Sequence, residues 1–315
     1  LSKFEIYDDL FPSRAEGVNS WVSIMRGCDK FCTFCIVPFT RGRERSRPID
    51  SVLNEIRDGV QNGFVEFTLL GQNVNSYSTP DGKFPLLLDK VAQIDGVKRL
   101  RFTSPHPKDV DDDMLEVMAK HDNICNQVHL PLQAGSDRIL KRMNRSYTST
   151  EFLNLVDKIR DYMPDCSITT DVIVGFPGET EEEFYETLSI SEKVKFNFAY
   201  MFKYSSRPGT KAAQYDEQID EATKQSRLER LINIQLDSTL SQNKLLIGKT
   251  IKVLVEKESK KSSSQWSGRS EGGIWVIFDK GNEKIGEIVD IKIEDARGVT
   301  LFGSNTHREY KYEVA

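Results

Sequence analysis

The first two thirds of the chain alternate between short apolar runs and longer segments whose apolar residues follow a helical spacing. Short apolar runs bounded by polar residues are typical of buried strands. The runs are residues 20–26, 64–71, 97–103, 125–132, 166–176 and 196–205. Helical patterns between them include residues 48–60, 109–120, 148–162 and 178–194. Six strand–helix repeats predict a parallel sheet with right-handed crossovers. Because a closed barrel of this kind needs eight, we expect an α/β fold with a partial (β/α)6 TIM-like barrel.

The pattern changes beyond residue 215. Residues 216–246 are expected to form one long connecting helix, because leucines and isoleucines recur there at helical spacing. From residue 247 to 315, frequent glycines and short alternating apolar runs predict a small all-β barrel. The run "ESKKSSSQ" (258–265) is interpreted as a loop. The barrel domain is expected over 20–215, and residues 1–19, which lack a Met and resemble a linker, are expected to connect it to a further N-terminal domain.

Composition narrows the class of protein. The 315 residues are 38% hydrophobic and 29% charged, as in ordinary soluble globular proteins. No apolar run approaches the roughly 18 residues that a membrane helix needs, so no membrane partner is expected. The net charge of −5 gives no overall attraction to nucleic acid, so any such binding must use local patches. An odd number of cysteines, three of them clustered, favours a reducing, cytoplasmic setting over a disulfide framework.

Three of the five cysteines, Cys28, Cys32 and Cys35, lie within the stretch "RGCDKFCTFCIVP". This loop directly follows the first predicted strand, and chemistry in such barrels sits at the C-terminal ends of strands. The cysteines have three interpretations. They are buried thiols, or ligands of a structural zinc completed by a distant fourth residue, or ligands of a [4Fe–4S] cluster that keeps one iron open. Cys125 and Cys166 lie in strand-like runs and are interpreted as buried thiols.

The pattern C-x3-C-x-Φ-C, with Phe34 before the third cysteine, resembles the radical S-adenosylmethionine (SAM) superfamily. The resemblance implies that the open iron binds SAM and that one electron cleaves it to methionine and a 5′-deoxyadenosyl radical. It also implies SAM contacts at later strand ends, where an arginine can clamp a carboxylate and an acidic residue can bind ribose hydroxyls. These implied contacts are Gly71, Gln72, Ser104, Gln133, Arg145, Asp171 for the ribose, and the Val172–Gly175 backbone edge for adenine.

Longer motifs, among them "LGQNVNSY", "LPLQAGSDRILKRMNRSYT" and "TDVIVGFPGETEEEF", resemble the radical SAM methylthiotransferases over essentially the whole chain. The resemblance is strongest to members that convert N6-isopentenyladenosine at position 37 of tRNA to its 2-methylthio derivative. Members that act on threonylcarbamoyladenosine or on a ribosomal protein are the alternative. The resemblance makes the C-terminal barrel a TRAM domain, an RNA-binding module. It implies a tRNA anticodon stem-loop, a low-potential electron donor and a sulfur donor as partners of a monomeric enzyme.

The family's sulfur is carried by a second [4Fe–4S] cluster held by three cysteines of an N-terminal domain. Residues 1–315 contain no such second triad. The resemblance therefore implies a fragment that cleaves SAM and binds RNA but does not complete methylthiolation alone.

Candidate RNA contacts are arginines beside the cysteine loop and aromatic residues in the C-terminal barrel. "RGRERSRP" places Arg41, Arg43, Arg45 and Arg47 two residues apart. The alternative is a solvated charge run, which is the usual role of a basic stretch. In the barrel, Trp266 and Arg269 are candidates for stacking on bases. Trp266 is expected to be exposed in the Ser-rich loop.

Overall fold

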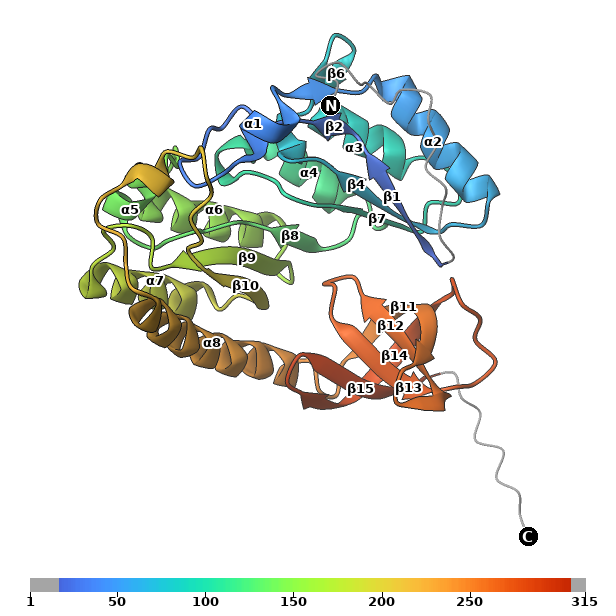
Figure 1. Ribbon diagram of the computed structural model, residues 1–315. Coiled ribbons are helices and arrows are strands. Elements are labelled where there is room, and N and C mark those ends of the chain that lie inside the picture. Colours follow the sequence, from blue (N-terminus) through green and yellow to red (C-terminus); the bar gives the residue numbers. More distant parts are fainter. Residues whose placement is uncertain (1–16, 307–315) are drawn as a thin grey trace.

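The computed structural model describes residues 17–306, so most of the linker expected at 1–19 lies outside the described residues. Figure 1 shows an α/β domain followed by a long helix and a small β-barrel. The six predicted parallel strands are all present. They are β1 (Asn19–Ser23), β4 (Glu66–Leu70), β7 (Arg99–Phe102), β8 (Gln127–His129), β9 (Ser167–Val174) and β10 (Phe198–Lys203).

The six strands form two three-stranded parallel sheets, ordered β1-β4-β7 and β8-β9-β10. A single parallel bridge, from Leu100 to Ile124, joins the two sheets. Beside this bridge, β7 and β8 are connected by a side-chain hydrogen bond, which Arg101 donates to Gln127 (2.6 Å). No ladder joins β1 to β10 in the part of the chain that the structure describes, so the barrel is open along this seam. The predicted partial (β/α)6 barrel is confirmed.

Helices cover the outer side of the sheets. They are α2 (Ile49–Gln61), α3 (Phe84–Ala92), α4 (Asp112–Lys120), α5 (Asp137–Arg142), α6 (Ser149–Tyr162), α7 (Glu181–Val194) and α8 (Glu221–Lys244). The four predicted helical patterns correspond to α2, α4, α6 and α7. Capping boxes start α6 at Thr148 and α7 at Thr180. Pro48, the first residue of the expected helical range 48–60, is the N-cap that precedes α2. Helix α3 was not predicted, because "FPLLL" is a continuous apolar run without a helical period.

Strand register separates an outer from an inner face, because successive side chains point to opposite sides. Phe67, Leu100 and Ile168 are fully buried in the main core under the helices. Their neighbours along the strands, such as Glu66, Arg101 and Thr169, point inward. We call this inward side the lumen. Its lining is mostly polar, unlike the tightly apolar outer face.

Helix α8 begins at Glu221 instead of residue 216 and packs along the last strand of the sheet. Polar side chains fix it there. Gln235 and Thr239 donate hydrogen bonds to the carbonyls of Phe196 (2.9 Å) and Asn197 (3.0 Å). Asn243 bonds Gly298 of the β-barrel (2.9 Å). The helix is therefore the sixth helix of the partial barrel as well as a connection between domains.

The C-terminal domain is a closed barrel in the order β11-β12-β13-β15-β14. Its strands are β11 (Thr250–Ser259), β12 (Ser262–Ser270), β13 (Trp275–Asp279), β14 (Ile288–Arg297) and β15 (Thr300–Asn305). The loop interpretation of residues 258–265 is wrong, because β11 and β12 form a hairpin through this segment. Its serines and lysines gave no strand signal, since the hairpin end is exposed and makes no demand for apolar side chains.

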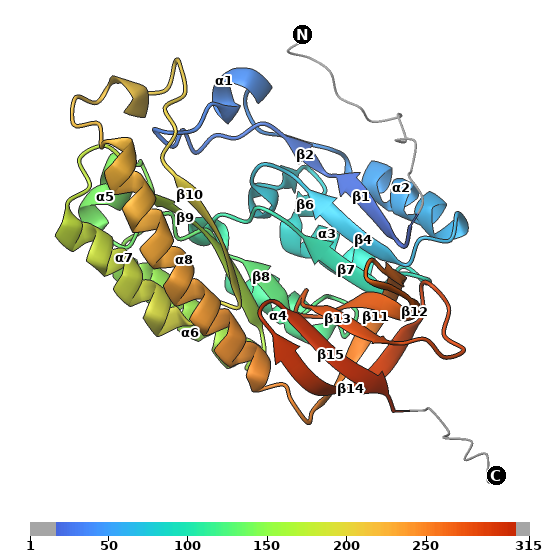
Figure 2. The same cartoon turned by 60° about the horizontal axis from the view of Figure 1, so that its bottom comes forward.

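The β-barrel lies against the starting ends of β4 and β7 (Figure 2). Buried charged side chains connect the two. Glu66, which is fully buried, accepts bonds from Arg101 (2.9 Å) and from Arg269 of the β-barrel (2.7 Å). Arg99 donates to the backbone carbonyl of Lys252 in the β-barrel (3.0 Å), and Arg101 to that of Ser270 (2.8 Å). The two domains are therefore joined by charge-assisted hydrogen bonds in a dry setting.

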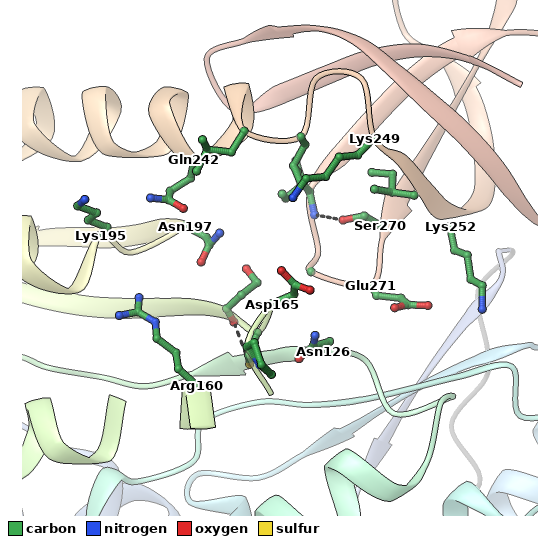
Figure 3. Close-up of a pocket in the computed structure, with 18 of the residues that line it drawn as sticks. Asn126, Arg160, Asp165, Lys195, Asn197, Gln242, Lys249, Lys252, Ser270 and Glu271 are labelled. Atoms are coloured by element: carbon green, nitrogen blue, oxygen red, sulfur yellow. Dashed lines mark hydrogen bonds between the residues drawn. The ribbon is translucent and has the colours of Figure 1, made fainter. Parts of the chain in front are cut away.

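A cavity of about 520 Å³ lies beside this junction, between the start of the second sheet and the β-barrel. Figure 3 shows Arg160 and Lys195 at one side, Lys249 and Lys252 at the other, and Asp165 and Glu271 between them. Its charges are thus mixed, and it lies at the opposite end of the strands from the cysteine loop. No helix in residues 17–306 is both long enough and apolar enough to cross a membrane.

Candidate active site at the mouth of the partial barrel

The cysteine loop, residues 27–36, lies across the C-terminal ends of the strands. Its backbone is bonded to the segments that follow α5 and β10. Thr33 donates to the carbonyl of Met143 (3.0 Å) and accepts from the amide of Ala212 (2.9 Å). Asn144 donates to the carbonyls of Lys30 and Phe31 (3.1 and 3.0 Å). The three cysteines therefore sit where the sequence predicted chemistry, at the mouth of the lumen.

Gly27 and Gln72 set the start of this loop. Gly27 has φ +85°, and a Cβ there would lie 2.1 Å from the carbonyl oxygen of Arg43. Only glycine fits such a left-handed, crowded position. Its amide donates to Oε1 of Gln72 (2.6 Å). The side-chain carbonyl oxygen of Gln72 thus supports the cysteine loop, and the expected contact of this turn with SAM stays a prediction. Gly71 lies beside it, against Met25.

A polar network beneath the loop was missed by the sequence analysis. Lys30 donates to Asp109 (2.7 Å), which also accepts from Asn73 (2.9 Å). Glu44 accepts from the amide of Asp29 (3.1 Å) and from the hydroxyl of Ser76 (2.8 Å). These bonds join the loop to the segments that follow β4 and β7. The partners are 15 to 79 residues apart in sequence, so no local pattern signals them.

The three thiols are half-buried and lie near one another. Burial raises the pKa of Cys28 to about 11 and also raises the pKa of Cys35. Thiolates are the metal-binding form, so these two need a cation to become ligands. Within residues 17–306, no three His, Cys, Asp or Glu side chains meet closely enough to hold a single metal ion. Three thiolates in one loop are a ligand set typical of an iron–sulfur cluster.

Arg145 brings a positive charge to the thiols. Its Nη1 lies 3.4 Å from Sγ of Cys32, while Nη2 donates to the carbonyl of Pro131 (3.2 Å) and Nε to Tyr147 (3.0 Å). Burial alone would lower the pKa of Arg145, but the Tyr147 hydroxyl and the Cys32 thiol raise it above its usual range. A fixed guanidinium beside a thiol stabilises the thiolate and suits an anionic cluster with a carboxylate-bearing cofactor.

Backbone strain is concentrated at this mouth. Among residues 17–306, five residues other than glycine have positive φ, and four of them are Phe31, Ser104, Gln133 and Asn144. Strain of this kind clusters at functional sites. Gln133 is 93% buried, yet its Oε1 has no hydrogen-bond partner. An orphaned buried acceptor normally has a ligand or water to satisfy it, so Gln133 and Ser104 fit a bound polar cofactor.

The residues of β9 that were expected to contact SAM point to different sides of the strand. Asp171 points into the lumen, and its Oδ2 lies 3.3 Å from Nε2 of His129. Val172 points outward into the core, and its strand is paired on both edges, with Gln133 and with β10. The Gly175 amide donates to Glu179 (2.7 Å), a carboxyl whose pKa is raised to about 7 by burial. The Val172–Gly175 segment therefore already uses part of its backbone for pairing, and its expected contact with adenine stays a prediction.

The candidate RNA contacts also separate into two groups. Arg41 ends the short helix α1 (Val37–Arg41) beside the cysteine loop. Arg43 is largely exposed and pairs with Asp29 (3.0 Å), and Arg45 lies in the short strand β3 (Arg45–Ser46), paired with β2 (Met25–Arg26). Arg47 differs, because it forms a buried ion pair with Glu55 (2.6 Å) and bonds the carbonyl of Ser23 (2.7 Å). The structure thus assigns Arg47 to the core instead of to RNA.

In the C-terminal barrel, the expectations that Arg269 stacks on bases and that Trp266 lies in an exposed loop both need correction. Arg269 binds Glu66 (2.7 Å) and Glu256 (2.6 Å), so it is a domain-junction residue rather than a base-stacking one. Trp266 lies on β12 opposite Phe278, half-buried against the barrel core, with Lys280 over its ring (4.4 Å). It is not in a loop, because the Ser-rich segment is a hairpin.

Comparison with known proteins agrees with this geometry. The model of the radical SAM superfamily matches residues 22–190, which include the cysteine loop and the strands around it. The TRAM domain model matches residues 244–305, the closed β-barrel. A tRNA-2-methylthio-N(6)-dimethylallyladenosine synthase of Porphyromonas gingivalis is 50% identical over 310 residues, covering 96% of this chain and 67% of the relative. The chain belongs to the tRNA-2-methylthio-N6-dimethylallyladenosine synthase family.

Other relatives and solved structures support the same placement. The synthase of Parabacteroides distasonis is 51% identical over 96% of this chain. The chain therefore spans about two thirds of the length of these family members. Among solved structures, the radical SAM methyltransferase TsrM of Kitasatospora setae, with a [4Fe–4S] cluster bound, has a TM-score of 0.53 at 18% identity, covering 62% of this chain and 39% of TsrM. This likeness shows the fold alone. Membership of the radical SAM superfamily implies a [4Fe–4S] cluster and SAM.

Proposed function

We propose that this chain is the SAM-cleaving and RNA-binding part of a radical SAM methylthiotransferase that converts N6-isopentenyladenosine at tRNA position 37 to its 2-methylthio derivative. The observation that carries the proposal is the cysteine triad at the mouth, with Arg145 against Cys32, in a chain 50% identical to synthases of that name. In the net reaction, the hydrogen on C2 of the adenine is replaced by a methylthio group.

Cys28, Cys32 and Cys35 would hold the [4Fe–4S] cluster, and Phe34, packed on the core behind them, would shield it. When bound there, the cluster would supply the electron for cleavage of SAM. Arg145 holds positive charge beside Cys32 and orients Tyr147. His106, whose pKa burial lowers to about 2, stays neutral behind Tyr147 and adds no charge to the site.

SAM itself would be held by groups that the structure leaves available at the mouth. The unsatisfied Oε1 of Gln133 is suited to an amino group or a ribose hydroxyl. Asp171 is suited to the ribose hydroxyls, and Ser104 and the turn at Gly71 line the adjoining strand ends. Arg41, Arg43 and Arg45 are suited to phosphates of the anticodon stem-loop, and Trp266 is a further candidate on the TRAM domain.

Other participants are part of the proposal. The relatives are longer than their match with this chain, and we infer that a second [4Fe–4S] cluster lies outside residues 1–315. A sulfur donor supplies the inserted atom, a second SAM supplies the methyl group, and a low-potential donor supplies electrons. The enzyme is proposed to work as a monomer in the cytoplasm, where its tRNA substrate is found.

The test is anaerobic reconstitution with iron and sulfide, followed by metal analysis and a SAM-cleavage assay. We expect about four irons and four sulfides per chain. Deoxyadenosine formation should be stimulated by an isopentenylated anticodon stem-loop more than by the unmodified one. The matched control is Cys32→Ala, which removes one ligand of the triad and should lose both iron and SAM cleavage. One zinc per chain with no iron would refute the proposal. Stimulation by a threonylcarbamoylated stem-loop instead would assign the chain to the methylthiotransferases that act on that nucleoside.

A further inference from the structure

Strand β10 carries three exposed aromatic side chains in alternation, Phe198, Tyr200 and Phe202. They are 37%, 52% and 52% exposed, although the strand belongs to the sheet that forms the main fold. We call these three residues the aromatic stripe. The residues between them, such as Ala199 and Met201, pack outward against α8. Because strand side chains alternate between faces, the whole stripe points into the lumen.

The stripe lies next to a proposed cofactor ligand. In the parallel ladder, Tyr200 is in register with Asp171 and Phe202 with Ile173. His129 connects Tyr200 with Asp171. Its ring packs edge-on against that of Tyr200, with 5.9 Å between the ring centroids, and its Nε2 lies 3.3 Å from Oδ2 of Asp171. Neighbouring strands are about 4.8 Å apart. A group resting on Tyr200 would therefore lie one strand away from the ribose that we assign to Asp171.

The open seam gives the stripe an aromatic counterpart. β1 and β10 are the outer strands of the two sheets, and no ladder joins them in residues 17–306 (Figure 2). On β1, Trp21 is in register with Thr68 and shares its lumen side, and it is 53% exposed. The rest of the lumen lining is mainly polar. Both edges of the seam thus present large aromatic rings on the lumen side.

We propose that the aromatic stripe, with Trp21 across the seam, receives the apolar N6 substituent and the face of the target adenosine. This proposal rests on the proposed function and names the residues that select its substrate. Flat aromatic rings bind a nucleobase by stacking and bind a branched alkyl group by burying its surface. The occupant is an N6-prenylated adenosine in a single-stranded loop.

Charge at the stripe disfavours the alternative substrate. A threonylcarbamoyl substituent ends in a carboxylate. At the stripe it would meet the carboxylate of Asp171, and Lys203 points to the other side, where it pairs with Glu221 of α8. Like charges brought together at an interface are strongly unfavourable. An uncharged prenyl group meets no such penalty, so the site favours it over the acidic substituent.

The test measures RNA binding instead of turnover. Reconstituted chain is titrated anaerobically against labelled anticodon stem-loops that carry adenosine, N6-isopentenyladenosine or N6-threonylcarbamoyladenosine at the same position, and dissociation constants are read by fluorescence anisotropy. The variants are Tyr200→Ala, Phe202→Ala and Trp21→Ala. Tyr200→Phe keeps the ring. Tyr185→Ala is the matched control, because Tyr185 is an equally exposed aromatic (56%) on the outer helix α7.

We expect the wild-type chain to prefer the isopentenylated RNA. Each alanine variant should weaken binding of that RNA about tenfold, since it removes stacking on the base and burial of the prenyl group together. Binding of the unmodified RNA should weaken less, because only the stacking is lost, so the preference for the isopentenylated RNA should shrink. Tyr200→Phe and Tyr185→Ala should keep the wild-type preference. If the wild type prefers the isopentenylated RNA and all three alanine variants retain that preference, the inference is overturned and the proposed function stands. If the wild type binds none of the three RNAs, the proposed function itself is refuted.

Discussion

Replacing Glu66 by Ala tests whether the buried charges at the domain junction hold the two domains together. Glu66 has no exposed surface, and its two oxygens accept bonds from Arg101 (2.9 Å) and Arg269 (2.7 Å). Removing one member of a buried charge group usually costs about 3–5 kcal/mol, because the remaining charges stay buried without their partner. Here Arg269 keeps Glu256, and Arg101 keeps the carbonyl of Ser270. We therefore expect the lower end, about 3 kcal/mol.

The assay is urea denaturation followed by tryptophan fluorescence. Trp21 reports on the partial barrel, and Trp266 and Trp275 report on the TRAM domain. The matched control is Glu258→Ala, which removes an exposed carboxylate paired with Lys280 and should cost less than about 1 kcal/mol. The double variant of Glu66 and Arg269 should lose less than the sum of the singles, with a coupling of about 1–3 kcal/mol. A Glu66→Ala loss no larger than the control's would refute this account of the junction.

Four further predictions concern the mouth of the barrel. Arg47→Ala should lower stability by about 3 kcal/mol and leave the salt dependence of RNA binding unchanged, because Arg47 is buried against Glu55. Arg43→Ala should do the reverse, reducing the slope of log affinity against log salt by about 0.7 with little loss of stability, and equal slopes would contradict the assignment. Gly27→Ala should lower iron content after reconstitution, because its Cβ would collide with the Arg43 carbonyl; normal iron content would disprove the steric argument. Gln133→Ala should weaken SAM binding in calorimetry about tenfold without changing iron content, and unchanged SAM affinity would remove Gln133 from the site.

The sequence predicted the features that depend on local pattern. Apolar runs located all six parallel strands, and the spacing of the cysteines located the mouth. What it missed depends on partners that are distant in sequence. Arg47 and Arg43 look alike in "RGRERSRP", and only the fold shows that one meets Glu55 and the other stays exposed. Arg269 meets Glu66 across 203 residues, which no spacing rule could show.

Other misses had a signal that was ambiguous on its own. "FNFAYMFK" contains aromatic residues at every second position, which indicates one aromatic face of a strand. The pattern does not say which face turns to the helices, and the register with β9 decides this. For Gln72, the motif indicates a turn at a strand end, whereas its bond to Gly27 appears only once two loops are brought together.

The fold constrains how RNA can use both ends of this protein. The TRAM domain is fixed at the starting ends of β4 and β7, whereas Arg41, Arg43 and Arg45 lie beside the cysteine loop at the other end. The longest strand between these ends, β9, has eight residues and spans about 26 Å at ~3.3 Å per residue. A loop adenosine placed in the mouth therefore leaves the TRAM domain to bind a part of the RNA some 25 Å away. Helices cover the outer side of the sheets, and no ladder joins β1 to β10 in residues 17–306, so we propose that one RNA contacts both ends along this seam.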